Sequence, residues 1–381
     1  MGALLLSQKF PGLRILVVVP TETLQKQWFQ QLSAEGLDLQ SNVVIINTLI
    51  KNQYECDLLI LDEAHRYAST LNIQVFERVK YRFILALSAT MERLDGKHEL
   101  LYKYCPVVDR ITDAEAIANG WVAESIEYKV MLDVDDLDTY KAITKEFNEH
   151  FEFFQWDFDK VMSMTGKNGF TNRWQYCKDT YPDDYAMQKD YLKSVTFHAM
   201  GFMKTMQSRK KFVQNHPEKI RIAKEIIKYR SDKKIVTFNA NTAMAEAYKE
   251  GYVYTGKEGK KKNRITLEEF SRMPSGVLNS CKMAIEGLNL PDLSVGIQTG
   301  IDSSKTKAVQ SLGRVVRLAK GKLGAEFFTL VINDTVETKW MQNAKKDSQI
   351  EIIDVENLMH VLKGEPYELY KRKIKNFTFR F

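Results

Sequence analysis

Asp57-Leu-Leu-Ile-Leu-Asp-Glu-Ala-His65 is the most informative stretch of the chain. Its apolar run predicts a short strand buried on both faces, and two adjacent carboxylates follow the strand at once. In an open α/β sheet, ligands bind at the carboxyl edge of the strands. One carboxylate there can hold Mg²⁺ while its neighbour polarises an attacking water. An acidic pair after a strand is usually a solvated loop, but the complete Asp-Glu-Ala-His unit favours a functional site.

Working outward, the first third of the chain alternates apolar runs with amphipathic stretches. Arg14–Pro20, Val43–Ile46 and Arg82–Leu87 predict further buried strands. Between the first two, Thr21–Leu32 has helical spacing, with Thr21 or Thr23 as its N-cap. Strands separated by helices predict a parallel α/β unit, which we expect to span residues 1–130.

Beyond Val130 the pattern changes. Residues 131–217 are rich in aromatic and charged side chains, and they predict a mainly helical insertion or linker. Its aromatic residues are more typical of a helical core than of a base-stacking surface. Alternation resumes over 218–334, which predicts a second α/β unit with strands at 234–238, 276–279, 293–297 and 325–331. The remaining residues, 335–381, predict a helical tail with a basic end, Lys371-Arg-Lys-Ile-Lys375.

Bulk composition excludes several classes. The chain has 381 residues, a formal charge of +6 and 44% hydrophobic residues, as in ordinary globular proteins, and this weak basicity is compatible with nucleic acid without requiring it. The four cysteines form no CxxC pair, so neither a zinc site nor a disulfide framework is indicated. With no apolar run of the roughly 20 residues that a membrane span needs, we expect a cytoplasmic protein without a membrane partner.

At the acidic unit the chain resembles the superfamily 2 DNA and RNA helicases, whose second motif matches Asp62 to His65. The resemblance implies two RecA-like domains that bind ATP and Mg²⁺ between them. It implies Asp62 as the metal ligand, Glu63 as the catalytic base and His65 as a coupling residue. Ser88-Ala-Thr90 ends the next strand and resembles the third motif, so Ser88 and Thr90 would join hydrolysis to strand movement.

Further segments match the helicase motifs in the family's order. They are Val19–Trp28, Ile46–Leu49, Ala116–Trp121, Ile235–Asn241 and Leu278–Pro291. The third of these is similar to the segment that closes the first domain in phage branch-migration helicases and type I restriction translocases. The resemblance implies nucleic-acid contacts from Thr21, Gln27, Thr48, Asn239, Ser280 and Lys282. It implies nucleotide contacts from Glu286, Gly287 and Asn289, the last standing where the family often has aspartate.

Gln310-Ser-Leu-Gly-Arg-Val-Val-Arg317 resembles the sixth motif, with Ser311 where arginine is commoner. Residues three and four apart share one face of a helix, so Gln310, Arg314 and Arg317 are expected to point the same way. Two guanidinium groups on one face can meet a γ-phosphate across a cleft, as an arginine finger does. The resemblance therefore implies catalytic roles for all three residues.

The phosphate-binding loop, G-x-x-x-x-G-K-[ST], is the main departure from the family pattern. None of the five Gly-Lys pairs in the sequence is followed by Ser or Thr. In family order the loop would precede Met1, since Met1–Lys9 resembles the helix that the loop opens. Three explanations stay open: the true start lies upstream, a separate polypeptide supplies the loop, or the chain is a relative that binds nucleic acid without hydrolysis.

The expectation from sequence is thus an ATP-dependent helicase or translocase, a hydrolase, that acts on nucleic acid, with DNA favoured. A phage origin, which would place the protein in the host cytoplasm, is an inference from the closest subfamily. The alternatives are a non-catalytic helicase-derived binding protein, one half of a split helicase, a duplex translocase that never separates strands and, ranked last, a nuclease-coupled motor.

Overall fold

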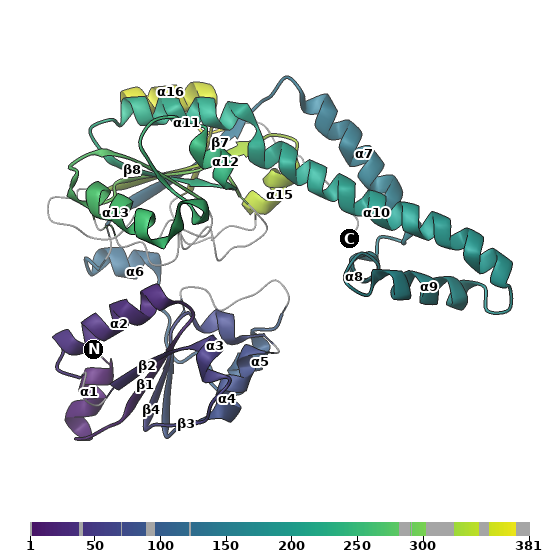
Figure 1. The fold of residues 1–381 in the computed structure, drawn as a ribbon. Helices are drawn as coiled ribbons and strands as arrows, with labels where there is room; N and C mark the ends of the chain where they lie inside the picture. Colours follow the sequence, from purple (N-terminus) through teal and green to yellow (C-terminus); the bar gives the residue numbers. More distant parts are fainter. Residues whose placement is uncertain are drawn as a thin grey trace.

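The computed structural model describes residues 2–37, 41–69, 71–88, 96–121, 123–281, 290, 292–301, 324–342 and 350–370. Figure 1 shows two α/β units, one above the other, and a helical arm that projects from the upper unit. Strands in both units pair in parallel. The predicted fold class, parallel α/β with a mainly helical insertion, is therefore confirmed.

The first unit is built on a parallel sheet with the order β2-β1-β4-β6. Its strands are β1 (Ile15–Val19), β2 (Ser41–Ile45), β4 (Leu58–Leu61) and β6 (Phe83–Ala86). A short parallel ladder joins β3 (Tyr54–Glu55) to β5 (Val79–Lys80). The helices are α1 (Gly2–Lys9), α2 (Glu22–Ala34), α3 (Ile46–Leu49), α4 (Val75–Arg78), α5 (Glu99–Tyr102) and α6 (Asp113–Ala118), with 3-10 turns η2 (Ala64–Tyr67) and η3 (Asn72–Gln74).

Both faces of this sheet are covered, which explains why its strands read as continuous apolar runs. Alternate residues of β1 point to opposite faces: Leu16 and Val18 pack in one apolar cluster, and Ile15, Val17 and Val19 pack in another. All five residues of β1 are buried. The strand therefore lies at the centre of the unit, beside β4 with its acidic end.

The second unit is built on a larger parallel sheet with the order β13-β7-β12-β11-β8-β10-β9. Its strands are β7 (Ser125–Leu132), β8 (Lys234–Asn239), β9 (Tyr252–Tyr254), β10 (Gly276–Cys281), β11 (Val295–Gln298), β12 (Ala325–Ile332) and β13 (Ile350–Asp354). Its helices are α11 (Pro217–Tyr229), α12 (Thr242–Glu246), η4 (Gly256–Glu258), α13 (Gly259–Arg272), α15 (Val336–Gln342) and α16 (Val355–Lys363).

The domain limits expected from the sequence need two corrections. The boundary at 130 falls inside β7, which pairs with β12 and β13 and so belongs to the second sheet. The tail expected over 335–381 is not only helical, because β13 lies within it and forms the edge of the same sheet. In both cases the pairing joins strands about 200 residues apart or more, a contact that local sequence pattern does not reveal.

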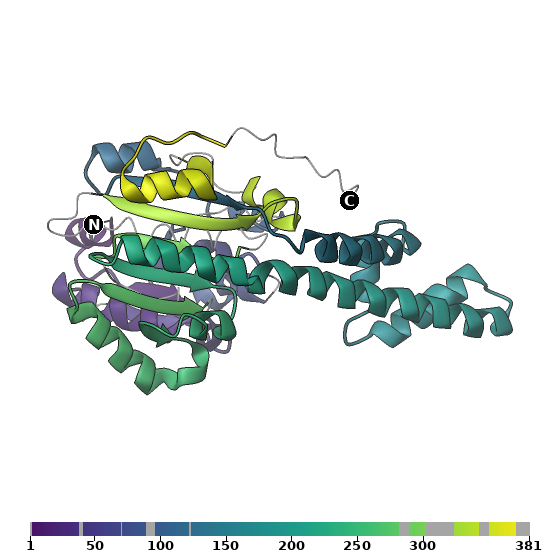
Figure 2. The ribbon, with the colours of Figure 1, turned by 90° about the horizontal axis from the view of Figure 1, so that it is seen from above.

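The arm consists of α7 (Leu137–Phe153), α8 (Phe158–Ser163), α9 (Gly169–Thr180) and α10 (Tyr185–Asn215). Figure 2 shows α10 running from the sheet far out to the tip of the arm. Aromatic side chains fill the arm's interior, among them Phe147, Phe151 and Phe202. The expectation that the aromatic residues form a helical core is therefore confirmed for this cluster.

No helix in the described part of the chain is both long enough and apolar enough to span a membrane.

Candidate functional site

The acidic segment follows β4 at the carboxyl edge of the first sheet. The Asp62 N–H donates to the Val18 carbonyl of β1 over 3.0 Å, and the Ala64 N–H donates to the Leu87 carbonyl beyond β6 over 2.8 Å. These bonds attach the segment to the strands on both sides of β4. Since the three strands are parallel, the acidic residues lie at the edge where such sheets bind ligands.

The Asp62 carboxylate is half-buried and held by two donors. Its Oδ1 accepts from the Glu63 N–H over 3.0 Å, and its Oδ2 accepts from the indole Nε1 of Trp28 over 2.9 Å. A carboxylate has about four acceptor sites, so each oxygen keeps a lone pair for a cation or a water. The side chain is therefore oriented before any ligand arrives.

Glu63 has a left-handed backbone, with φ of 54° and ψ of 50°. For a residue with a Cβ this conformation costs about 1–2 kcal/mol. Such strain persists where the surrounding structure imposes it, and it is concentrated at functional sites. The Glu63 Oε2 lies 3.4 Å from the His65 Nδ1. The turn thus places a second carboxylate beside an imidazole, directly after Asp62.

His65 connects the two strand ends. Its ring is 7% exposed, and Nδ1 lies 3.0 Å from the Ser88 Oγ. Ser88 follows β6, so the hydrogen bond bridges the acidic segment and the segment that resembles the third motif. The contact joins the ends of β4 and β6. Thr90, the partner residue expected in that role, lies outside the described residues.

Tyr67 attaches the turn after β4 to strand β1. Its hydroxyl donates to the Val18 carbonyl over 2.8 Å, and the side chain is buried. Burial, with a smaller contribution from the Asp62 charge, raises the pKa of Tyr67 far above its usual value. The phenol therefore stays a neutral donor and keeps the turn attached to β1.

Sequence reasoning missed Trp28. It read the Thr21–Leu32 stretch as an amphipathic helix, and Trp28 then counts as one more core residue. An indole N–H usually finds a hydrogen-bond partner when it is buried, and this rule could have directed attention to an acceptor such as the nearby acidic segment.

The expected nucleic-acid contacts of the first unit lie at the same sheet edge. Thr21 follows β1 and caps α2, with its Oγ1 accepting from the Leu24 N–H over 3.4 Å. Gln27 is half-buried on α2, and Thr48 is exposed on α3, directly after β2. Thr21 and Thr48 come just after β1 and β2, whereas Gln27 lies within α2.

The second unit corrects two of the expected nucleic-acid contacts. Asn239 is 2% exposed and its amide bonds inside the protein, donating to Thr237 Oγ1 and the Ser280 carbonyl while accepting from Thr299 Oγ1. Ser280 is 1% exposed and its hydroxyl donates to the Thr237 carbonyl over 2.8 Å. Both side chains are buried and hydrogen-bonded within the protein, so this structure does not expose them to a nucleic acid.

The other expected residues of the second unit lie outside the part of the chain that the structure describes. They are Lys282, Glu286, Gly287, Asn289, Gln310, Arg314 and Arg317.

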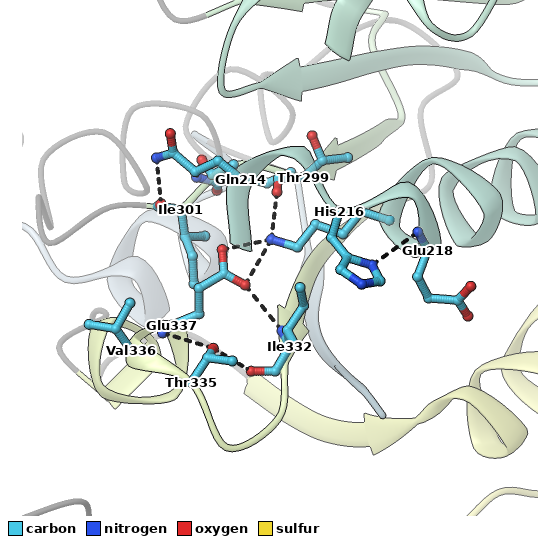
Figure 3. A network of polar contacts seen from close by, with 12 residues as sticks. Gln214, His216, Glu218, Thr299, Ile301, Ile332, Thr335, Val336 and Glu337 are labelled. Atoms are coloured by element: carbon cyan, nitrogen blue, oxygen red, sulfur yellow. Dashed lines mark hydrogen bonds and ion pairs between the residues drawn. The ribbon is translucent and has the colours of Figure 1, made fainter. Parts of the chain in front are cut away.

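A buried ion pair is bonded to the backbone at Thr299, which precedes Gln310, Arg314 and Arg317 in the chain. Lys219 of α11 and Glu337 of α15 are fully buried, and the Lys219 Nζ lies 2.6 and 2.8 Å from the two carboxylate oxygens. The same Nζ donates to the Thr299 carbonyl over 2.8 Å, and Glu337 also accepts from the Ile332 N–H. Figure 3 shows Thr299 and Ile332 next to Glu337, each joined to the pair by a dashed line. The network joins the ends of β11 and β12 to α11.

Two neighbouring contacts extend the network toward the arm. The Gln214 side chain of α10 donates to the Ile301 carbonyl over 3.4 Å. His216, between α10 and α11, accepts the Glu218 N–H at Nδ1, and its Nε2 lies 2.9 Å from Asp136 (Figure 3 shows the first contact). The root of the arm is therefore attached to the same strand end as Lys219.

Comparisons with known proteins find helicases and translocases among the similar chains. Residues 192–360 match the family model of the ERCC3/RAD25/XPB C-terminal helicase. The DNA 3'-5' translocase XPB2 of Sulfurisphaera tokodaii is 25% identical over 327 residues, which cover 79% of this chain and 69% of that protein.

Solved structures show the same fold. Dbp5 of S. cerevisiae, bound to RNA and ADP BeF3, is similar with a TM-score of 0.51 and 10% identity, covering 92% of this chain and 80% of that chain. A fragment from a type I restriction enzyme of Vibrio vulnificus YJ016, assigned as its HsdR subunit, has a TM-score of 0.52 and 16% identity. The similarity covers 93% of this chain and 58% of the fragment.

The parallel sheets are consistent with RecA-like helicase domains, and the homology supports a helicase or translocase. Residues 192–360 are thus similar to the ERCC3/RAD25/XPB C-terminal helicase, and most of the chain is similar to an XPB-type translocase.

Proposed function

We propose that this chain is an ATP-dependent motor of superfamily 2 that moves along DNA. The observation that carries the proposal is the turn after β4. There a pre-oriented carboxylate, a second carboxylate in a left-handed turn and an imidazole bonded to Ser88 meet at the carboxyl edge of a parallel sheet.

The donor set at this edge fits Mg²⁺. This cation is usually held by one or two carboxylates, with substrate phosphates and waters completing its coordination. The Asp62 carboxylate is half-buried, oriented by two N–H donors and open to further ligands. We therefore assign Asp62 as the metal ligand in a site that a nucleotide completes.

ATP, when bound, would supply the phosphoanhydride bond whose hydrolysis drives the motor. Glu63 would accept the proton of the attacking water, since its carboxylate follows the metal ligand directly in the chain. His65 would pass the change at this turn to Ser88 through their hydrogen bond. Gln310, Arg314 and Arg317 are proposed to meet the charge that develops on the γ-phosphate, a role that rests on the motif resemblance.

Thr21, Gln27 and Thr48 are the proposed contacts to nucleic acid in the first unit. They lie at the same edge as Asp62, on the segments that follow β1 and β2. Hydroxyl and amide side chains of this kind bind phosphate oxygens and fix the register of a strand without reading its sequence. We favour DNA because the archaeal relative is described as a DNA translocase.

A second candidate is a helicase-derived protein that binds DNA without hydrolysis, or half of a split helicase whose other half supplies the phosphate loop. This second candidate stays open because the sequence contains no Gly-Lys-Ser or Gly-Lys-Thr. On either reading, ATP turnover by this chain alone should be very low.

The two candidates differ in how nucleotide affects DNA binding. Affinity for a labelled duplex and a single strand should be measured without nucleotide, with ADP and with a non-hydrolysable ATP analogue, each with Mg²⁺. A motor predicts that affinity changes with the nucleotide, and that Asp62→Asn removes the change. Glu77→Gln, an exposed carboxylate on α4, is the matched control and should leave it intact.

Nucleotide-independent affinity in the wild type would favour the non-catalytic binder. Preference for RNA over DNA would correct the substrate. In every case the affinity should fall steeply with salt, because phosphate contacts release counterions.

A further inference from the structure

We propose that Trp28 is a positioning residue that fixes the Asp62 carboxylate for its cation. This inference rests on the proposed function, because it takes Asp62 as the metal ligand. No motif assignment gave Trp28 a role, and the proposal comes from one contact: the indole Nε1 lies 2.9 Å from the Asp62 Oδ2.

The position of the indole is itself fixed. Its ring packs against the apolar cluster on one face of the first sheet, which includes Val17 and Val43. Helix α2 is capped by Thr21, and its Gln25 side chain donates to the Val43 carbonyl of β2 over 2.6 Å. Since both the ring and its helix are attached to the sheet, the N–H points to one place.

The contact leaves the carboxylate able to bind a cation. The indole N–H occupies one acceptor site on Oδ2, and the Glu63 N–H occupies one on Oδ1. With about four acceptor sites in total, both oxygens remain available. A neutral donor orients the group without the competing positive charge that a lysine or arginine would bring, so the attraction to Mg²⁺ is retained.

Residues that orient a metal ligand change metal affinity by about 10- to 100-fold when they are replaced. The substitution Trp28→Phe keeps an aromatic ring in the core and removes the N–H. Loss of a purely structural residue would lower the melting temperature and leave the metal dissociation constant of the folded protein unchanged. A positioning role predicts that the metal dissociation constant rises while the melting temperature changes little.

The experiment uses the full chain with Mn²⁺ and a saturating non-hydrolysable ATP analogue, followed by electron paramagnetic resonance. It compares wild type, Trp28→Phe, Asp62→Asn and the control Trp121→Phe. Trp121 is 55% exposed, which makes it a matched tryptophan outside the site. Tryptophan fluorescence is the second readout, because paramagnetic Mn²⁺ at Asp62 quenches an indole bonded to that carboxylate. Melting temperatures are recorded without metal.

The expected result is equal Mn²⁺ affinity in wild type and Trp121→Phe, affinity weaker by about 10- to 100-fold in Trp28→Phe, and none at this site in Asp62→Asn. Quenching should occur in wild type and disappear in Asp62→Asn. This comparison stays valid even if Trp28→Phe folds poorly, and absence of quenching in a wild type that binds Mn²⁺ through Asp62 would overturn the inference.

Two outcomes separate the inference from the proposed function. If folded Trp28→Phe binds Mn²⁺ as tightly as wild type while Asp62→Asn does not bind, the role of Trp28 is refuted and that of Asp62 stands. If Asp62→Asn binds as tightly as wild type, the proposed metal site fails, and the inference fails with it.

Discussion

Replacing Lys219 by Met should destabilise the second unit strongly. The substitution removes three hydrogen bonds from the Nζ, to Thr299 and to both oxygens of Glu337. Glu337 would then be fully buried with the Ile332 N–H as its remaining donor among the described contacts. Breaking a buried pair in this way costs about 3–5 kcal/mol, because the surviving charge is uncompensated.

The pKa directions support this reasoning. Burial lowers the pKa of Lys219 and raises the pKa of Glu337, while the attraction between the two groups opposes both shifts. The charged pair is thus maintained by mutual contact and not by solvent. Lys219→Met together with Glu337→Gln should therefore cost less than the sum of the single changes, by about 1–3 kcal/mol.

The assay is native-state hydrogen exchange of the full chain, followed in peptides from β11, β12 and α11. Global unfolding is less suitable, because a chain with two units does not unfold in one step. Lys224→Met, an exposed lysine on the same helix, is the matched control and should stay within about 0.5 kcal/mol of wild type. A loss of less than about 1 kcal/mol for Lys219→Met would refute the argument.

Three further predictions concern the arm and the acidic turn. Burial, and then the neighbouring His150, lower the pKa of His198 below its usual 6.5, so the unfolded chain takes up this proton first. The arm should lose stability as pH falls below about 6.5, and His198→Gln should flatten that dependence in melts recorded across pH. Gly201→Ala should lower the stability of the arm by about 1–3 kcal/mol and so lower its melting temperature, because a Cβ there would lie 2.2 Å from the His150 Nε2. An unchanged melting temperature would contradict the close approach of α10 to His150. Glu63→Gly should leave stability equal or higher by up to about 1 kcal/mol in thermal melts, since it removes the left-handed strain; a large destabilisation would show that the Glu63 side chain stabilises the turn.

Sequence patterns predicted the strands of the first unit well. β1 and β4 are short, continuous and apolar. Between helical stretches, such runs are typical of parallel strands buried on both faces. The sequence offered Thr21 or Thr23 as the cap of the following helix, and the structure has Thr21, since a threonine before an amphipathic stretch has a clear local role. In each case the determining interactions lie within a few residues of each other.

Failures came where contacts join distant parts of the chain. Nothing near Ser125 indicates that β7 pairs with β12 and not with the first sheet. Asn239 was expected to contact nucleic acid because its segment resembles a helicase motif, yet its side chain is buried and bonds to Thr299, which comes 60 residues later. Trp28 reaches Asp62 across 34 residues, and the spacing of a helix says nothing about that acceptor.

The position of β7 in the second sheet determines where a fragment that contains the second unit must begin. A fragment that begins with the arm, or with the matched family segment at 192, would omit a strand that lies between β13 and β12. Removing it would leave two unpaired strand edges inside one sheet, and such edges recruit other chains into aggregates. A fragment designed to fold by itself should therefore start upstream of Ser125 and continue through α16.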